Sequence, residues 1–489
     1  MTFARRAWPV LLFALCLPAG AANAQPVDYK PDRADFKDMR LVGYDDLQGR
    51  SAYQPIAEQQ GNRWIAYIGH HGGSAFNPQT QQVEPNGTSI VDVTDPTHPV
   101  YLHHIPGPAG AGESGGAQMV RMCPGDGFPN AAANHLVGKF FLLRTNGTQG
   151  HQVYDVTDPA HPQLVSTPID GQTDTHKNWW ECDTGIAYLV GAAPGWRTSR
   201  MTQIYDLSNP YEPKFIRNFG LDSQQPGATG PVEIQLHGPY RLGNRVYFGY
   251  GTSSNGILQI VDRDKLLNGD PTVPEAQRFE PTRANLLYPQ IARYDQGPTN
   301  GAHTVFPIMN VSPPSFANYT RGKTRNIIAL TNESTGNECR ENPQMTYFVD
   351  ITTETEPYGV GSFHVEDSSG GAVPFCKRGG RFGSHSSDER INPMYYGKVL
   401  WVAYFNAGIR AIDIREPWAP KEIAYYIPAI TANTDVRCTD NNDPSTCKRA
   451  IQTNNLDTDN RGYVYAVDRA NTGMHIVALQ GNAAKILNP

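Results

Sequence analysis

A strand, a proline-fixed turn and a second strand recur along this chain. Between residues 151 and 165, hydrophobic and polar positions alternate as in a half-buried β-strand, and Asp158-Pro159 marks the turn that follows it. Pro162 then opens a second strand, a position at which strands tolerate proline. The same pattern returns at residues 89–99, 202–213, 346–357 and 409–420, and in degenerate form at residues 258–263 and 474–479. The chain therefore contains seven copies of one structural unit.

Each copy contains two consecutive hydrophobic residues followed by a third residue, which is Asp in all copies but the last. These positions are Asp92, Asp155, Asp206, Asp262, Asp350 and Asp413, with Ala478 in the seventh copy. An aspartate that persists through this many copies is expected to be structural.

Another hydrophobic strand precedes the signature strand of each copy. These segments are residues 63–68, 139–143, 186–190, 245–250, 326–330, 398–404 and 463–467. A polar, glycine-containing loop follows each of them, so the innermost strand of each unit must come before them. No stretch has a sustained helical period. The pattern predicts an all-β fold, a seven-bladed β-propeller.

The ends of the chain predict how the ring closes. Residues 39–44 resemble the outward strand that follows each proline turn, as in residues 214–219, whereas the last copy runs out soon after Leu479. We therefore expect an N-terminal strand to pair into the last blade and close the ring, which removes exposed sheet edges.

The repeated strand resembles that of a known family. Ser89-Ile-Val-Asp-Val93 and Leu258-Gln-Ile-Val-Asp262 are similar to the strand after which the LVIVD-repeat family is named. The resemblance covers nearly the whole mature chain and implies a seven-bladed propeller of an exported bacterial type. It implies no particular activity, because a fold does not assign one.

The N-terminus has the features of a secretory signal peptide. Arg5-Arg6 precede an apolar run over residues 8–17, which is too short to cross a bilayer, and small residues follow up to Ala24. The arginine pair is compatible with twin-arginine export, but the surrounding residues match that signal poorly, so we expect ordinary secretion. The predicted organisation is a signal peptide at 1–24, an extended segment at 25–37 and one propeller at 38–489, located in the periplasm or secreted.

Charge and hydropathy limit the classes of partner. The net charge is −6, and the chain has neither a basic patch for nucleic acid nor a polybasic membrane anchor. Beyond the signal there is no apolar run long enough for a membrane span.

Six cysteines remain once Cys16 leaves with the signal. An even number in an exported chain predicts disulfides, and six cysteines allow fifteen pairings. Cys438 and Cys447 bracket a short polar loop and form the best local pair. None lies in a Cys-x-x-Cys motif, which argues against a thiolate metal site.

Four consecutive units carry a histidine just ahead of the second strand, where the innermost strand begins. They are His176, His237, His303 and His385, and other units have Gln54, Gln118 and Asn454 at about this place. The loops after the second strands, which lie on the same face of a propeller, contribute His70, His71, Arg144, Arg197, Glu333 and Arg469. We expect these side chains to meet at one mouth of the central channel.

Clustered neutral imidazoles are common metal ligands and suit copper, iron, zinc or nickel. The alternative interpretation is purely structural, with the histidines capping strands. Three units lack the histidine, however, so the blade fold does not require it. Their placement is similar to that of propeller metalloenzymes, namely the carotenoid-cleaving oxygenases and the methanethiol oxidase, thiocyanate dehydrogenase and nitrous oxide reductase groups. The absence of cysteine ligands and the periplasmic location favour copper, with iron or zinc as alternatives.

Three functions remain open from the sequence. The first is a metal-dependent oxidoreductase acting on a small molecule, with His176, His237, His303, His385, His70 and His71 as ligands and with Glu333, His71 and Arg144 in catalytic roles. The second is a metal-free polysaccharide lyase or hydrolase that uses His237, Tyr250 and Arg144 or Arg197. The third is a non-catalytic propeller that binds a protein or glycan through its loops.

Overall fold

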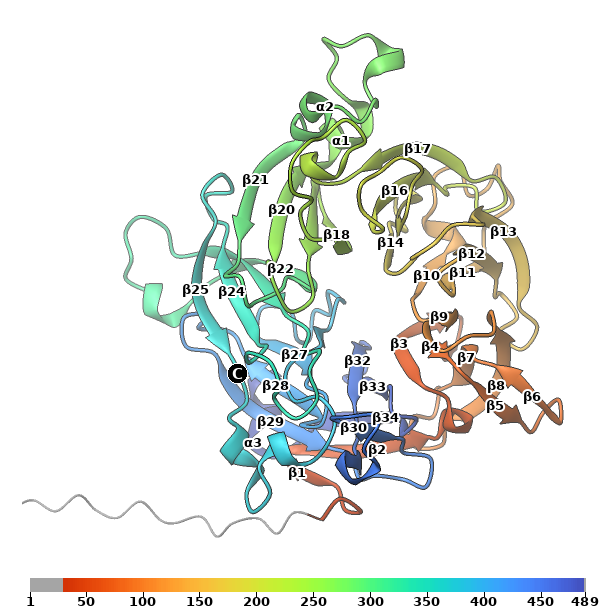
Figure 1. The fold of residues 1–489 in the computed structure, drawn as a ribbon, viewed down its shortest axis with the longest axis vertical. Helices are drawn as coiled ribbons and strands as arrows, with labels where there is room; N and C mark the ends of the chain where they lie inside the picture. Colours follow the sequence, from red (N-terminus) through yellow and green to blue (C-terminus); the bar gives the residue numbers. More distant parts are fainter. Residues whose placement is uncertain (1–29, 488–489) are drawn as a thin grey trace, which may run out of the picture.

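Seven antiparallel sheets are arranged in a ring in the computed structural model, which describes residues 30–487 (Figure 1). This architecture confirms the predicted all-β, seven-bladed β-propeller. The predicted signal peptide, residues 1–24, lies outside the described residues.

Each blade runs from its first strand at the centre of the ring to its last strand at the outside (Figure 1). Blade one consists of β3 (Ala52–Gln60), β4 (Arg63–Gly72), β7 (Gly87–Asp92) and β8 (Val100–Pro106). Blade two consists of β10 (Val120–Pro124), β11 (Phe140–Asn146), β12 (Gly150–Asp155) and β13 (Gln163–Ile169). Blade three consists of β14 (Asn178–Trp180), β15 (Ile186–Gly191), β16 (Met201–Asp206) and β17 (Lys214–Phe219). Blade four consists of β18 (Leu236–Leu242), β19 (Arg245–Tyr250), β20 (Ile257–Asp262) and β21 (Gln290–Asp295). Blade five consists of β22 (Thr304–Val311), β23 (Arg325–Thr331), β24 (Thr346–Asp350) and β25 (Tyr358–Phe363). Blade six consists of β26 (Ser386–Ser387), β27 (Val399–Ala403), β28 (Ile409–Asp413) and β29 (Lys421–Ile427). Blade seven consists of β32 (Thr453–Thr458), β33 (Val464–Asp468), β34 (Gly473–Leu479) and β2 (Met39–Asp45).

The outer strand of blade seven comes from the other end of the chain. β2 pairs antiparallel with β34, from Met39 opposite Leu479 to Asp45 opposite Met474. It also lies directly against blade one, because a Cβ added to Gly43 would come within 1.9 Å of the Pro96 carbonyl oxygen in the proline turn. The predicted closure of the ring by an N-terminal strand is therefore confirmed.

A second N-terminal strand was not predicted. β1 (Asp35–Lys37) lies within the segment expected to be extended and adds to the outer edge of blade six by pairing with β29. The N-terminal chain thus contacts two neighbouring blades before it enters blade one.

The repeated aspartates stabilise the turns between the third and fourth strands. Asp92 and Asp155 each accept a hydrogen bond from the backbone N–H two residues later, at 2.8 and 3.0 Å, and Asp206, Asp350 and Asp413 do the same. This is the Asx turn, in which a short polar side chain replaces a backbone acceptor. The aspartates are structural, as their persistence through the copies predicts.

Smaller elements decorate the loops. These are the hairpins β5 (Ser74–Asn77) with β6 (Gln82–Pro85) and β30 (Val436–Cys438) with β31 (Cys447–Arg449), the strand β9 (Gly112–Gly116), and the helices α1 (Arg263–Asn268), α2 (Arg283–Leu287) and α3 (Gly481–Ala484). Within residues 30–487, no helix is long and apolar enough to cross a membrane.

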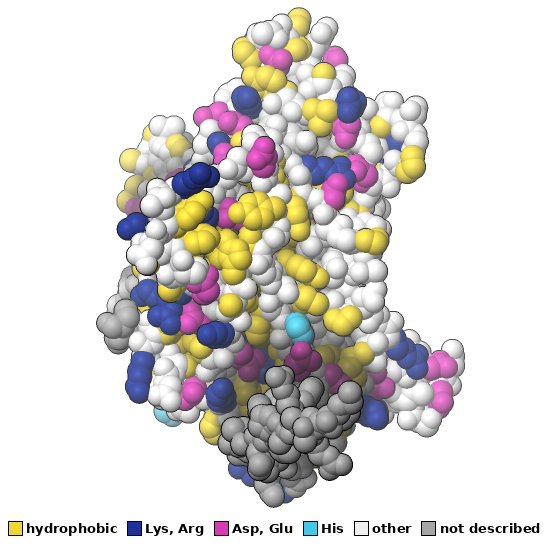
Figure 2. Space-filling model, turned by 90° about the vertical axis from the view of Figure 1, so that its left-hand side faces the viewer, with side chains coloured by type: hydrophobic (Ala, Val, Ile, Leu, Met, Phe, Trp, Pro, Cys, Tyr) yellow, Lys and Arg dark blue, Asp and Glu magenta, His cyan; other side chains and the backbone are white. Residues whose placement is uncertain are grey.

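The hydrophobic core lies within and between the blades, where the large apolar side chains of the middle strands are buried. Several exposed large apolar residues lie on outer strands, among them Phe36 on β1, Phe215 on β17 and Tyr358 on β25. Figure 2 shows one such flank, where hydrophobic side chains gather in the middle and charged ones lie around them.

All six cysteines within residues 30–487 are paired. The disulfides are Cys123–Cys182, Cys339–Cys376 and Cys438–Cys447, so the predicted local pair is confirmed. Cys438 and Cys447 are register partners across the β30–β31 hairpin. Disulfides persist in oxidising compartments, so three of them agree with an exported protein.

Replacing both Cys438 and Cys447 with serine is expected to lower the free energy of unfolding by about 2–3 kcal/mol, because a bridge over a short loop restricts the unfolded chain only modestly. The two cysteines are 9 residues apart. Urea denaturation of the oxidised wild type and the double variant measures the difference, and equal midpoints would contradict the prediction.

Candidate metal centre

Four histidines meet at the centre of the ring. His303 and His385 come directly before the innermost strands of their blades, His176 lies two residues before β14, and His237 lies in β18. All four are at most 3% exposed. Their ring centroids are 4.8 Å apart for His176 and His237, 3.4 Å for His237 and His303, and 4.6 Å for His303 and His385. The sequence therefore identified the imidazoles that converge.

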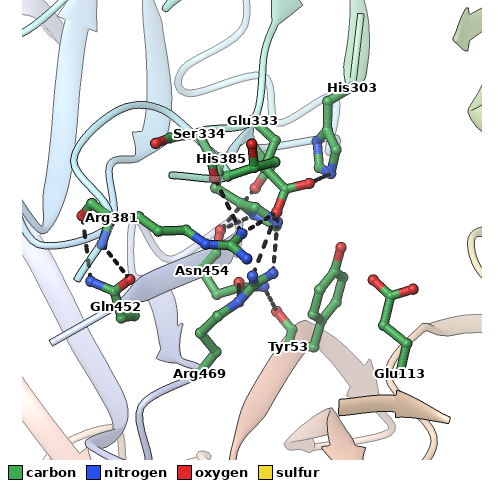
Figure 3. Close-up of polar contacts among 12 residues, drawn as sticks. Tyr53, Glu113, His303, Glu333, Ser334, Arg381, His385, Gln452, Asn454 and Arg469 are labelled. Atoms are coloured by element: carbon green, nitrogen blue, oxygen red, sulfur yellow. Dashed lines mark hydrogen bonds and ion pairs between the residues drawn. The ribbon is translucent and has the colours of Figure 1, made fainter. Parts of the chain in front are cut away.

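Glu333 joins two of these histidines. It follows β23 and is 8% exposed. Its carboxylate oxygens lie 3.4 Å from His303 Nε2 and 3.6 Å from His385 Nε2 (Figure 3). One potential ligand atom from each of His303, Glu333 and His385 lies within 4.8 Å of the others, so this buried group can hold a metal ion.

Backbone hydrogen bonds orient these imidazoles. His385 Nδ1 lies 2.6 Å from the Asn454 carbonyl, and His237 Nδ1 faces the His303 carbonyl. An Nδ1–H that donates to a carbonyl leaves the Nε2 lone pair for a metal, which is the usual arrangement around metal-bound histidine. The Nε2 atoms of His237 and His303 are buried without a hydrogen-bond partner. Because buried polar atoms are nearly always partnered, these two fit a ligand.

Tyr53 packs among the histidines His71, His176 and His385. The Tyr53 ring is 4.7 Å from His71 and 6.2 Å from His176, and it packs edge-on against His385 at 5.4 Å. His71 Nε2 is also buried without a partner. His176 Nδ1 lies 2.8 Å from the Gln118 side-chain amide and 3.7 Å from Glu113.

Two arginines hold Glu333 in place. Arg381 donates to Glu333 at 2.8 Å and to the Ser334 carbonyl at 3.1 Å. Arg469 lies 3.5 Å from Glu333, and its Nη2 donates to His385 Nε2 at 3.1 Å (Figure 3). A metal ion bound by His385 Nε2 would take the place of this last contact.

Burial keeps the imidazoles neutral. Burial and then Lys177 and His176 lower the pKa of His303 well below its ordinary value, and burial and then His303 and Arg469 do the same to the pKa of His385. Burial and Arg381 also lower the pKa of Arg469 to about 10, so this guanidinium stays charged at neutral pH. Neutral imidazole is the form that binds metal, so these ligands need not lose a proton first.

A cavity of about 470 Å³ lies beside the group. His71, Glu113, Arg381 and Arg469 line it together with Arg437 of β30, whereas His303, Glu333 and His385 lie behind this lining. Arg381 and Arg469 therefore face the cavity and also contact Glu333.

Two of the predicted site residues are not brought to this centre. Arg144 donates to the carbonyls of Ile105 at 3.0 Å and Pro106 at 2.9 Å, so its guanidinium lies between blades one and two. His70 is paired with Ser89 Oγ at 2.7 Å, on the opposite face of β4 from His71. The roles predicted for Arg144 and His70 are therefore corrected to structural ones.

The residues expected for a metal-free lyase are also dispersed. The Tyr250 hydroxyl donates to Gln259 within the core that blades three and four share. Arg197 donates to the carbonyls of Ser223 and Gly230. Neither contacts His237 among the interactions of the described residues.

Sequence reasoning missed Tyr53, Glu113 and Arg381. Tyr53 directly precedes Gln54, which the repeat alignment had already placed at the ring centre, so a strand-by-strand comparison could have found it. Glu113 on β9 and Arg381 lie in loop insertions without counterparts in other blades, and no repeat signal identifies them.

Farther from the cavity, a buried ion cluster lies next to the histidines. Glu389 accepts from both Lys177 and Arg121, and all three side chains are at most 7% exposed. Burial alone would raise the pKa of Glu389, but Lys177 and Arg121 hold it below its ordinary value. Lys177 directly follows His176, so this cluster fixes the backbone that presents one imidazole.

Acidification is expected to destabilise the metal-free protein. Burial lowers the pKa values of His104, His151 and His475 to about 4, against about 6.5 in an unfolded chain. Between these values the unfolded state binds more protons, so the stability present above pH 6.5 is lost as the pH falls, by about 2 kcal/mol per histidine at pH 5. Burial raises the pKa values of Asp45, Asp388 and Asp468, which act in the opposite sense but are fewer than the buried histidines.

Thermal unfolding at pH 7 and pH 5 measures this effect. We expect a lower melting temperature at pH 5, and an unchanged or higher one would contradict the assignment of these histidines as buried and neutral.

Comparisons with known proteins agree on the fold and add no activity. The solved structure of Sqt1 from Chaetomium thermophilum is similar to this chain, with a TM-score of 0.50 and 11% sequence identity over 90% of this chain and 99% of that one. At this identity the likeness concerns the fold alone. No protein-family model matches the chain, so its relation to the LVIVD-repeat family stays a resemblance. No curated protein sequence matches it.

Proposed function

We propose that this protein is an exported metal-dependent enzyme, an oxidoreductase that acts on a small molecule at the centre of the ring. One observation carries the proposal. His303, Glu333 and His385 present ligand atoms within 4.8 Å of one another in a buried group. The Nε2 atoms of His303 and of the neighbouring His237 make no hydrogen bond. His70, His104 and His151 also have one buried nitrogen without a partner, so it is the convergence of His237, His303, Glu333 and His385 that supports a metal here.

The donor set limits the metal. Two imidazoles and a carboxylate suit iron(II) or zinc, and additional imidazoles suit copper. His237 stacks on His303 and makes the donors mainly imidazole. Together with the expected export to the periplasm, this supports copper as the first candidate, with iron and zinc as the alternatives. The bound ion would supply redox or Lewis-acid chemistry.

The protein's own residues would bind and orient the substrate. Arg381 and Arg469 fix the Glu333 carboxylate and face the cavity. Tyr53 is buried against His71 and His385, and burial raises the pKa of its hydroxyl above the ordinary value. A neutral phenol at this position can donate a hydrogen bond or a proton to a group at the metal centre.

Copper(II) loading with electron paramagnetic resonance tests the ligand assignment. We expect nitrogen couplings from imidazole in the wild-type protein and weaker nitrogen couplings in His385→Ala. A copper signal without nitrogen couplings would overturn the proposed centre.

A metal-free lyase remains a second candidate on one observation. Arg469 donates to His385 Nε2, so this imidazole is satisfied without a metal. Tyr53, His385 and Arg469 would then provide the phenol, the base and the cation. The sequence analysis had assigned these roles to Tyr250, His237 and Arg144. Activity that survives complete metal removal would favour this candidate over the metalloenzyme.

A further inference from the structure

The cavity beside the proposed metal centre has an excess of cationic side chains. Its charged lining consists of Arg381, Arg437 and Arg469 against Glu113 and Asp435. Glu113 pairs with Arg200 at 2.5 Å, so an arginine outside the cavity lining balances much of its charge. Arg200 is held in turn by Asp174 at 2.7 Å.

The carboxylates near Arg381, Arg437 and Arg469 are too few to pair with all three guanidinium groups. Arg381 and Arg469 both contact Glu333, at 2.8 and 3.5 Å. Arg437 lies 3.6 Å from Asp435, and its Nε is buried without a hydrogen-bond partner. A buried guanidinium nitrogen without a partner is costly, which points to a missing acceptor.

The guanidiniums are also fixed in position. Arg437 Nη2 donates to the Arg469 carbonyl at 3.1 Å, and the Cys438–Cys447 disulfide closes the hairpin that carries Arg437. Arg381 and Arg469 lie over the Phe405 ring at 5.4 and 5.3 Å. Preorganised donors bind an anion at a smaller entropic cost than mobile surface side chains.

We propose that this cavity binds a small organic anion, a carboxylate or another oxyanion, through Arg437, Arg381 and Arg469. This assignment of substrate class rests on the proposed function, since it places the anion next to the metal group. Guanidinium groups match the planar geometry of such anions with paired hydrogen bonds. When Glu333 serves as a metal ligand, its charge is shared with the ion, and the bound anion then balances Arg381 and Arg469. The cavity volume of about 470 Å³ restricts the ligand to a small molecule.

Calorimetric titration of the full mature protein tests the proposal. Metal-loaded and chelator-treated protein are each titrated with sulfate and with acetate, and acetamide serves as the neutral analogue of acetate. We expect saturable binding of at least one anion and none of acetamide. Arg437→Gln should weaken anion binding about 10-fold or more, because it removes a charged hydrogen-bond donor. A preference for acetate indicates a carboxylate substrate, and a preference for sulfate indicates another oxyanion.

Arg415→Gln is the matched control, because Arg415 pairs with Asp413 at 2.7 Å in a proline turn of blade six and does not line the cavity. It should bind the anions as the wild type does. Absence of saturable anion binding in the wild type, or equal binding by Arg437→Gln, would overturn the inference. Metal retention is measured on portions of the same preparations that are set aside before chelator treatment. Protein that retains metal but binds no anion refutes this inference alone, and protein that binds the anion but retains no metal refutes the proposed function.

Discussion

Replacing His303 with alanine is expected to lower metal affinity by about 100-fold or more. Loss of groups that only orient a ligand typically costs 10–100-fold, and His303 is itself one of the proposed ligands. It is 1% exposed and its Nε2 lies 3.4 Å from Glu333. Competition with a chromogenic chelator measures the affinity of the wild type and the variant for the same metal.

His161→Ala is the control for this experiment. His161 lies in a peripheral proline turn, pairs with Asp158 at 2.8 Å and keeps 77% of its side chain exposed. Its removal should change neither metal affinity nor melting temperature. Because His303 stacks on His237, its truncation should also cost about 1–3 kcal/mol of stability, so His303→Gln is measured alongside it. If either His303 variant binds metal as tightly as the wild type, this histidine is not a ligand.

Deleting residues 36–46 is expected to abolish most of the soluble monomer. The deletion removes β2, whose pairing with β34 closes the ring, and buried Met39, which belongs to the core between blades six and seven. The exposed edge of β34 would then be free to pair with other molecules. Size-exclusion chromatography after identical expression of the two proteins measures the loss.

A shorter deletion separates ring closure from the rest of the N-terminal segment. Removal of residues 30–34 leaves both β1 and β2 in place and should leave a monomer. A 36–46 deletion that stays monomeric with an unchanged melting temperature would show that the ring closes elsewhere.

The fold was predictable because its signals repeat. Seven copies of one strand and turn fix the number of blades, and the missing outer strand of the last copy predicts the closure by residues 39–44. β1 was not predictable, because three residues, Asp35–Lys37, are too few for an alternating pattern. The hairpins of the loops have no counterparts in other copies, so the repeat alignment could not place them.

The candidate site was predictable only where it follows the repeat. The four inner-strand histidines occupy equivalent positions in successive blades, and the structure brings them together. His70 and His71 are neighbours on β4, and neighbouring strand residues point to opposite faces, so only one of them could reach the centre. The prediction that Arg144 lies at the mouth is wrong for a related reason. β11 extends to Asn146, so Arg144 lies in this strand and not in the loop after it.

The side chains around the histidines depend on insertions. Glu113, Arg381 and Arg437 come from segments that differ between blades, and only tertiary structure shows which of them face one cavity. The charge excess that suggests an anionic substrate is therefore a property of the assembled ring rather than of any motif.

Elemental analysis of the protein, produced with export to the periplasm of a bacterial host, tests the central claim most directly. The account predicts at least one transition-metal ion per chain, copper first, retained through desalting and lost when His303 is replaced. Wild-type protein that contains no bound copper, iron or zinc, and that retains none after loading with each of them, would contradict it.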